Sequence, residues 1–150
     1  MKKEITWKIS RFEELTIEEL YEILHLRCKI FVVEQKAPYL DMDYKDQKAL
    51  HLCGYADNRL VAYCRLFKAG GYFDEACIGR VIVAREYRGY GYGHDMMKKA
   101  IDIETSTLGE TKITISAQFY LKKFYESHGF IQTGEMYLED GLPHIRMKKN

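Results

Sequence analysis

Long apolar runs and blocks of like charge are missing from this 150-residue sequence. No apolar stretch approaches the roughly 20 residues that a membrane-spanning helix needs, and the basic start MKKEITWKIS lacks the apolar segment of a secretory signal. We therefore expect a cytoplasmic protein without a membrane partner. The formal net charge is only +1 and the basic residues are not clustered, so we expect no binding to nucleic acid.

The cysteines and histidines do not follow the spacings of disulfide-exchange or metal sites. None of the four cysteines forms a C-x-x-C pair, and each lies beside apolar residues, which is typical of reduced thiols in a core. The five histidines match neither H-E-x-x-H nor a zinc-binding spacing, so we expect no metal. The cysteines concerned are Cys28, Cys53, Cys64 and Cys77.

Linkers, internal repeats and low-complexity tracts are also missing, and the sequence has only two prolines. Apolar residues make up 47% and charged residues 30%, which is the balance of a globular domain. A chain of this length can bury one continuous core. We expect residues 1–150 to form a single domain, and a homodimer is compatible with this composition.

The spacing of apolar residues in the first third predicts a strand, a helix and a loop. Residues 5–9 alternate as a strand does, and the helix that follows begins with a capping box formed by Thr16 and Glu19. Apolar positions at steps of three and four predict the helix face that packs on a sheet. Residues 37–48 break this pattern and predict a loop. The predicted helix face consists of Ile17, Leu20, Leu24, Cys28 and Phe31.

The remaining two thirds predict a mixed α/β architecture. Two β-type runs joined around Asp57-Asn58 predict a hairpin, and a nearly all-apolar run predicts a central strand covered on both faces. Strand, helix, strand and helix in succession imply a parallel pair with a crossover, before a second hairpin closes the chain. We therefore predict a mixed, mostly antiparallel sheet with a central parallel pair and helices on both faces. The predicted strands are 50–56, 60–67, 76–84, 112–117, 130–138 and 143–148, and the helices end at Gly109 and Gly129.

Three alternating glycines occur in the segment 88–93, where the strand 76–84 is expected to turn into a helix. Such a turn exposes backbone N–H groups at a helix start, which suits a phosphate or diphosphate, and Arg88 adds a full charge. A tight turn without a ligand is the plainer interpretation. The spacing fits neither a P-loop nor G-x-G-x-x-G.

The same segment resembles the R/Q-x-x-G-x-G/A signature of the GNAT superfamily of N-acetyltransferases. Arg88, Gly91 and Gly93 match it, Val83 precedes them at the expected distance, and residues 116–130 (SAQFYLKKFYESHGF) resemble the second GNAT motif. The chain is similar to the ElaA-like branch of that superfamily over nearly its full length, in the segments 26–35, 43–52, 78–83, 115–130 and 137–147. The resemblance implies acetyl-coenzyme A as the donor and leaves the acceptor open.

The resemblance also implies a coenzyme site between the two parallel strands. Those strands would separate at their ends, and pantetheine would lie between them like an added strand, with an oxyanion donor at a backbone N–H near Val83. Core packing alone is the plainer role of the apolar residues concerned. The coenzyme-binding residues implied are Val81, Ile82, Val83, Arg88, Gly89, Tyr90, Gly91, Tyr92, Gly93 and His94.

The implied activity is acetyl transfer to a primary amine of a small molecule or peptide by direct attack. Tyr125 matches the tyrosine of the GNAT helix motif and is the candidate general acid, because a phenol with a pKa near ~10 keeps its proton until a thiolate forms. A structural tyrosine is the alternative. Many GNAT enzymes carry a glutamate base on the strand before the glycine turn, but this strand carries Arg80. The substitute bases are Glu34, His51, Asp140 and His144, and base catalysis through water is a further alternative.

Three arginines, Arg27, Arg65 and Arg80, interrupt otherwise apolar stretches. A buried guanidinium group needs a partner. Pairing with Glu34, Asp43 or Asp46 is the plainer interpretation, and a clamp on a carboxylate of the acceptor is the other. We therefore treat these arginines, together with His144, as candidate acceptor-binding residues.

Two other functions are compatible with the sequence. An arginine and aspartate pattern is similar to one in acyl-homoserine-lactone synthases, although the complete glycine motif at 88–93 favours coenzyme A over an acylated carrier protein. A coenzyme A-binding module without turnover is the second alternative, since a fold does not dictate activity. The synthase-like pattern comprises Arg27, Phe31, Asp41, Asp43, Asp46 and Arg65.

Overall fold

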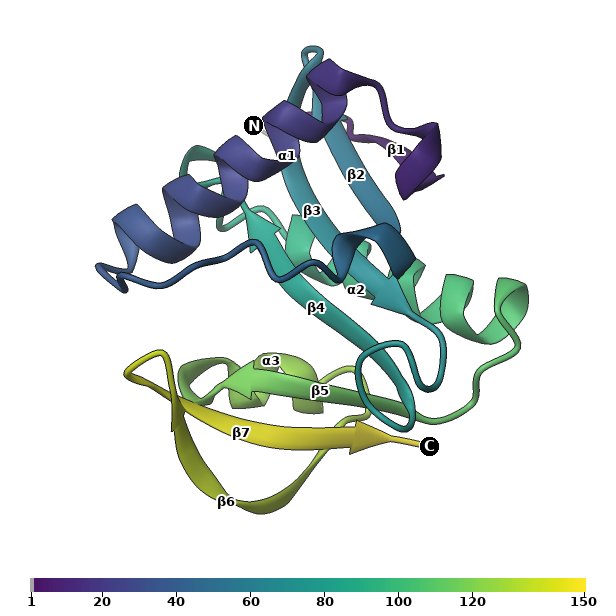
Figure 1. Ribbon diagram of the computed structural model, residues 1–150, viewed down its shortest axis with the longest axis vertical. Coiled ribbons are helices and arrows are strands. Elements are labelled where there is room, and N and C mark those ends of the chain that lie inside the picture. The colour runs from purple at the N-terminus through teal and green to yellow at the C-terminus, as the bar shows by residue number, and fades with distance from the viewer. Residues whose placement is uncertain (1) are drawn as a thin grey trace.

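A seven-stranded sheet forms the centre of the computed structural model, which describes residues 2–150 (Figure 1). The strand order is β1-β2-β3-β4-β5-β7-β6, and every neighbouring pair is antiparallel except β4 and β5. The predicted mixed sheet with a central parallel pair is therefore confirmed. The strands are β1 (Thr6–Arg11), β2 (Leu50–Ala56), β3 (Arg59–Phe67), β4 (Ala76–Val83), β5 (Ile113–Gln118), β6 (Ile131–Glu139) and β7 (Leu142–Lys149).

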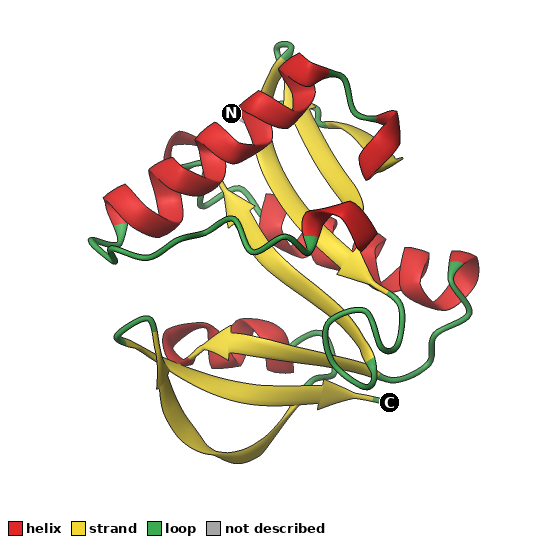
Figure 2. Ribbon diagram, viewed as in Figure 1, coloured by secondary structure: helices red, strands yellow, loops and turns green. Residues whose placement is uncertain are grey.

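Three α-helices cover the sheet, with α1 in front of it and α2 and α3 behind it (Figures 1 and 2). The first two continue as short π-helical segments, and a 3-10 turn precedes the third. Within residues 2–150, none of these helices combines the length and the hydropathy needed to cross a bilayer. The helices are α1 (Ile17–Arg27), extended by Cys28–Glu34, α2 (Tyr92–Asp102), extended by Ile103–Thr107, and α3 (Lys122–Glu126), preceded by Phe119–Leu121.

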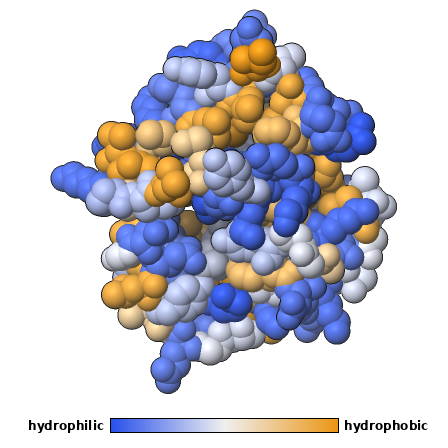
Figure 3. All heavy atoms as spheres, viewed as in Figure 1, coloured by the Kyte–Doolittle hydropathy of each residue, from blue (hydrophilic) through white to orange (hydrophobic). Residues whose placement is uncertain are grey.

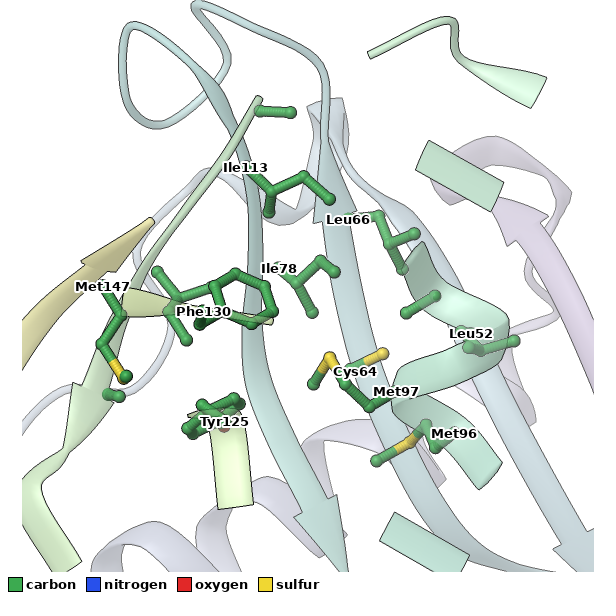
Figure 4. Close-up of a cluster of buried hydrophobic side chains, with 14 of the residues drawn as sticks. Leu52, Cys64, Leu66, Ile78, Met96, Met97, Ile113, Tyr125, Phe130 and Met147 are labelled. Atoms are coloured by element: carbon green, nitrogen blue, oxygen red, sulfur yellow. The ribbon is translucent and has the colours of Figure 1, made fainter. Parts of the chain in front are cut away.

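Each face of the sheet has its own hydrophobic core. Behind the sheet, side chains of α2 and α3 pack on the central strands, and Figure 4 shows Met96, Met97 and Tyr125 converging on Cys64 and Ile78. In front of the sheet, α1 contributes Ile23, Leu26 and Ile30 to a second cluster with side chains of β2, β3 and β4. The near-continuous apolar run of β3 and β4 is thus explained by cover on both faces.

The buried face of α1 differs from the predicted one. Ile17 is 84% exposed and Cys28 is also exposed, whereas Ile23, Leu26, Arg27 and Ile30 face the sheet. Both sets of positions recur at steps of three and four, so periodicity alone allows either face. The charged Arg27 lies within the buried face, so a search for apolar positions alone does not identify this face. The expectation of a core thiol is wrong for Cys28, while the other three cysteines are buried and free.

Local turn and cap signals agree with the structure. Thr16 Oγ1 accepts a hydrogen bond from the Glu19 amide, and the Glu19 carboxylate accepts one from the Thr16 amide, which confirms the capping box. Asp57 and Asn58 have φ of 52° and 61°, as a two-residue hairpin turn requires. The helix predicted to end at Gly129 is short, because its first turn is a 3-10 turn and α3 itself has only five residues.

One buried carboxyl group stands without a partner behind the sheet. Glu104, in the π-helical extension of α2, is 0% exposed, and neither of its carboxyl oxygens has a hydrogen-bond partner. Burial, and then the charge of Glu110, raises the pKa of Glu104 to about 8. The folded protein therefore keeps this proton at a pH where the unfolded chain has lost it.

Replacing Glu104→Gln is expected to stabilise the protein in weak alkali and to leave it nearly unchanged near pH 4. Because the folded pKa is raised, the contribution of the protonated acid is complete below the unfolded pKa of about 4.3 and is lost as the pH rises toward 8. Denaturant unfolding should show a gain of roughly 2 kcal/mol or more at pH 8. The exposed Glu126→Gln serves as the control, and a pH-independent effect of Glu104→Gln would contradict the assignment.

Candidate active site

The two parallel strands at the centre of the sheet pair over only two positions. Ala76 pairs with Ile113 and Cys77 pairs with Thr114, and beyond these residues β4 and β5 have no ladder contact. Figure 1 shows the two strands diverging from that point. A cleft lies in the resulting fork, and its walls include Gly79, Val81, Ser116, Gln118 and Tyr125.

A β-bulge in β4 sets the direction of this divergence. Arg65 pairs with Gly79 but Tyr63 pairs with Ile82, so β4 has one more residue than β3 over this stretch. Arg80 lies in the bulge with φ of 51°, a left-handed conformation that is uncommon for an arginine. Bulges bend a strand and increase its twist, so this one turns the end of β4 away from β5.

The last residues of β4 present main-chain groups to the open fork. The Ala84 amide donates to the Val61 carbonyl of β3, at 2.7 Å. Main-chain groups alternate in direction along a strand, so those of Ile82 also face β3, whereas those of Val81 and Val83 face the fork. Of the three residues expected to bind pantetheine through their backbone, Val81 and Val83 have the required orientation, and Ile82 does not.

The glycine-rich segment forms the expected turn into a helix. Gly89 and Gly91 have φ of 87° and 85°, and Gly91 is the N-cap of α2 without any side-chain cap. The first helical bond runs from the Asp95 amide to the Gly91 carbonyl, so the amides of residues 92–94 have no partner within the helix. These amides and the helix dipole suit a diphosphate. Tyr92 takes part through its backbone only, because its side chain is buried and its hydroxyl donates to the Lys3 carbonyl.

Arg88 links the turn to β4 and to the end of α1. Its Nε donates to the Val83 carbonyl at 2.9 Å, and its guanidinium group lies 2.9 Å from Glu34 Oε2. Glu34, a candidate base, is therefore neutralised beside the turn and is not among the residues that line the cleft with Tyr125. His94, on the first turn of α2, is exposed, and its Nδ1 lies 2.9 Å from His128 Nε2.

Tyr125 reaches the cleft from behind the sheet. Only 5% of its surface is exposed, its ring packs edge-on against Phe124 and Phe130, and it also lines the cleft. None of the side-chain hydrogen bonds within residues 2–150 involves its hydroxyl. Burial raises the pKa of Tyr125 further above its ordinary value, so the phenol stays protonated at neutral pH.

A polar cluster also lines this cleft, and only one of its members, His144, was predicted from the sequence as a site residue. His144 is 7% exposed, its Nδ1 donates to the Leu142 carbonyl at 2.8 Å, and its Nε2 lies 3.5 Å from Glu139 Oε2. Ser116 Oγ contacts Glu139 Oε1 at 3.3 Å and also bonds the Tyr137 hydroxyl. In the tautomer with the hydrogen on Nδ1, the lone pair of the His144 ring is on Nε2, 3.5 Å from the Glu139 carboxylate.

The three arginines singled out from the sequence form an ion network with three aspartates of one loop. Arg27 lies 2.7 Å from both Asp41 and Asp46, and Arg65 pairs with Asp43 and, at 2.8 Å, with Asp46. Arg27 is 0% exposed and Arg65 is equally buried, so neither guanidinium group reaches an acceptor. The pairing interpretation is therefore correct for both, with Asp41 as an additional partner that was not predicted.

Arg80 belongs to the same network but also lines the cleft. Its Nε lies 2.8 Å from Asp41 Oδ1 without hydrogen-bond alignment, and its Nη2 donates to the Asp41 carbonyl at 2.9 Å. Its Nη2 also lies 3.5 Å from Asp43. These contacts hold the bulged residue in place. They also compensate the positive charge of Arg80 where this side chain lines the cleft.

His51 is part of the support for this network and is remote from Tyr125. It is fully buried on β2, its Nδ1 lies 2.6 Å from the Tyr63 hydroxyl, and its Nε2 lies 2.9 Å from the Asp46 carbonyl. Burial lowers the pKa of His51, which keeps the ring neutral. Both ring nitrogens of His51 have hydrogen-bond partners, so this side chain supports the packing of the network.

Residues 2–150 contain no cluster of three or more metal-binding side chains.

The cleft opens on a surface of mixed character. On the face seen in Figure 3, hydrophilic side chains are interleaved with apolar ones. The ionisable side chains of the cleft wall are Arg80, Glu139, Asp140 and His144, besides the tyrosines. Since Arg80 is paired with aspartates outside the cleft, the uncompensated charge of the wall is negative. Such a wall favours a cationic group.

Comparisons with known proteins agree with this geometry. Residues 22–150 match the acetyltransferase (GNAT) domain family. The chain is 40% identical to protein ElaA of Escherichia coli K12 over 147 residues, which are 97% of this chain and 96% of ElaA. The crystal structure of E. coli ElaA superimposes with a TM-score of 0.92, at 39% identity, over 98% of this chain and all of that one.

Two further structures are similar to this chain. An acyl-CoA N-acyltransferase from Pseudomonas aeruginosa has a TM-score of 0.90 and 37% identity, over 97% of this chain and 99% of that one. A coenzyme A-dependent acyl-homoserine lactone synthase, in a structure with S-adenosylmethionine and isopentyl-CoA, has a TM-score of 0.74 over 97% of this chain and 82% of that one. At 17% identity, the second likeness shows a shared fold.

Replacing Asp46→Asn is expected to lower the free energy of unfolding by about 3 kcal/mol, because it leaves two buried guanidinium groups short of a partner. Burial by itself would raise the pKa of Asp46, but Arg27 and Arg65 outweigh it and lower that pKa. The stability from this group is thus complete above the unfolded pKa of about 3.9 and is lost in stronger acid. Denaturant unfolding tests this, with exposed Asp74→Asn as the control; equal stability of the two variants would contradict it.

Proposed function

The chain belongs to the GNAT acetyltransferase family, and from this premise we propose that it transfers an acetyl group from acetyl-coenzyme A to a primary amine of a small molecule or peptide. One observation carries the proposal. The open edge of β4 and the Tyr125 side chain border the same fork in the sheet, and the uncapped start of α2 adjoins the end of β4, where Gly93 packs beside Val83. A thioester bound along that edge would have a donor of protons beside its sulfur.

The donor would bind mainly through the backbone. Val81 and Val83 offer main-chain groups along the fork, as an added strand requires, and the amides of residues 92–94 meet the diphosphate at the start of α2. Arg88 lies at the same turn, where its guanidinium group is paired with Glu34 at 2.9 Å. The free N–H near Val83 is the oxyanion donor in this arrangement, because it faces the fork where the thioester carbonyl would lie.

The chemical step needs no covalent enzyme intermediate. The amine nitrogen attacks the thioester carbon, its C–N bond forms, and the tetrahedral intermediate collapses as the C–S bond breaks. The departing thiolate takes the proton of the Tyr125 hydroxyl, which the raised pKa has kept in place. As the amide forms, the nitrogen of the intermediate gives its surplus proton to solvent water, and the Tyr125 phenolate takes a proton back from solvent. The products are an N-acetylated acceptor, coenzyme A and the proton that His144 received from the acceptor.

The proton of the acceptor ammonium would pass to His144. Its free Nε2 faces the cleft wall beside Glu139, whose negative charge stabilises the imidazolium that forms. Glu139 and Asp140 also attract a cationic amine to this wall. Of the four substitute bases named from the sequence, we assign this role to His144, because β4 carries Arg80 where many GNAT enzymes carry a glutamate.

The proposal is tested by thiol release from acetyl-coenzyme A in the presence of polyamines, amino acids, short peptides and aminoglycosides, with calorimetry of coenzyme A binding in parallel. Acceptor-dependent thiol release with a mass gain of one acetyl group on the acceptor supports it. Failure to bind coenzyme A would overturn the donor assignment, and binding without any turnover would favour a coenzyme A-binding module.

Replacing Gly91→Ala is expected to weaken coenzyme A binding about tenfold, because a side chain at φ of 85° strains the turn that carries the free amides. Gly109→Ala is the matched control, since Gly109 also has positive φ, at 72°, but lies beyond the far end of α2. Calorimetric titration with coenzyme A separates the two. Equal loss of affinity in both variants would mean that the effect is one of stability.

Replacing Tyr125→Phe is expected to reduce turnover by roughly 10² while coenzyme A affinity stays the same, because the variant loses the proton donor and keeps the ring packing. Steady-state kinetics and calorimetry measure the two effects. Tyr63→Phe is the control: its hydroxyl is also buried, but it bonds His51 outside the cleft, so turnover should persist. Unchanged turnover in Tyr125→Phe would remove Tyr125 from the mechanism.

A further inference from the structure

Arg146 lies on β7 in an environment unlike that of the three network arginines. Its guanidinium carbon is 4.3 Å from the centroid of the Phe73 ring, so the flat group rests on an aromatic face. The side chain is half-buried, and its Nε is buried without a hydrogen-bond partner. The aromatic contact fixes the position of the charge but does not neutralise it.

No carboxylate of residues 2–150 forms an ion pair with Arg146. Arg27, Arg65 and Arg80 each have at least two aspartate contacts. Two acids, Asp74 and Glu75, line the same hollow as Arg146, and Glu75 is itself engaged by Lys148 at 2.9 Å and by the Thr114 hydroxyl at 2.7 Å. A half-buried guanidinium held in one place, with unused donors, is matched by a planar anion such as a carboxylate.

Arg146 shares a continuous polar surface with the proposed acetyl-transfer site. In the register of β5 and β7, Ser116 lies opposite Arg146 and Gln118 lies opposite His144. Residues opposite each other, or two apart on one strand, point to the same face of a sheet, so Arg146 and His144 lie on the same side. In Figure 1, this front face of β5 and β7 is clear of the three helices.

Three adjoining hollows connect these positions along that face. The cleft with Tyr125 and a second hollow share Arg80, Ser116 and Glu139 in their walls. The second hollow shares Tyr72 and Phe73 with a third, whose wall contains Arg146. One groove therefore runs from the transfer site, past Ser116, to the unpaired guanidinium group.

We propose that Arg146 binds a carboxylate of the acceptor, and that the acceptor is an amino acid-like molecule or short peptide whose amine lies well away from that carboxylate. The inference rests on the proposed function for the position of the amine. The amine end meets the negative wall at Glu139 and His144, and the acid end meets Arg146, so the two charged ends of the groove impose one orientation. The carboxylate clamp that the sequence suggested for Arg27, Arg65 or Arg80 is assigned to Arg146 instead.

The spacing of the two ends limits the acceptor length. His144 and Arg146 are two residues apart on one strand, a separation of about 7 Å. Two extended peptide units cover the same distance, at roughly 3.3–3.6 Å each. A dipeptide joins the two ends, whereas the amine and carboxylate of a single α-amino acid are too close together to reach both.

The test compares glycylglycine with glycylglycinamide, which differ only in the carboxylate, and with glycine as the shorter molecule. Binding of each is measured by NMR titration in the presence of saturating coenzyme A, and again without it. Wild-type protein should bind glycylglycine at least tenfold more tightly than either of the other two, as a bidentate charged contact implies. Arg146→Gln should remove this preference, while Arg11→Gln, on the far edge strand β1, should keep it.

Each comparison is a ratio of two affinities measured on the same protein preparation. Partial unfolding of Arg146→Gln would weaken both affinities alike and would not produce the expected loss of preference. Equal affinity for glycylglycine and its amide in the wild-type protein would overturn the inference, as would a preference that persists in Arg146→Gln or the absence of glycylglycine binding. Coenzyme A binding is read separately in calorimetry. Its loss with the carboxylate preference intact would overturn the proposed function and leave the Arg146 site standing.

Discussion

The short contact between β4 and β5 is the constraint on which the rest of the structure depends. Parallel neighbours normally continue their ladder, and these two stop after Cys77 and Thr114. Had the ladder continued, the main-chain groups of Val81 and Val83 would be used within the sheet. The bulge at Arg80 prevents this, and the contacts of Arg80 with Asp41 keep its left-handed conformation in place. A local backbone irregularity therefore produces both the fork and the free strand edge.

The ion network explains why so many charged side chains near the fork are not ligand sites. Arg27, Arg65 and Arg80 come from α1, β3 and β4, and all three meet the aspartates of a single loop. The network thus fastens that loop over the front of the sheet and leaves no net charge. The polar groups that remain uncommitted are few, and they lie where chemistry or recognition is proposed.

These uncommitted groups are arranged along one groove in an order that suits a two-ended molecule. The Tyr125 hydroxyl and the His144 and Glu139 pair border the fork, and Arg146 lies at the other end. Burial raises the pKa of Tyr125, so its phenol stays protonated, and the Leu142 carbonyl fixes the tautomer of His144. The proposed proton donor, proton acceptor and anion site are thus separated in space by the strand geometry.

Elements whose signals lie within a few residues were predictable. The capping box at Thr16, the Asp57-Asn58 turn and the glycine turn at 88–93 each depend on local backbone preferences, and each is found as predicted. The strand and helix order, together with the motifs, was enough for the mixed sheet and the family. By contrast, the buried face of α1 was misassigned, because an apolar pattern does not register a buried arginine such as Arg27.

The sequence by itself therefore determined the order of the elements, the caps and turns, and the position of the glycine turn into α2, all of which follow from neighbouring residues. Only the tertiary structure decided which arginines are neutralised and which is free, that Ile82 faces β3 while Val83 faces the fork, and that Glu139 and Ser116 adjoin His144. These outcomes depend on contacts between residues far apart in the chain, and no local pattern encodes such distances.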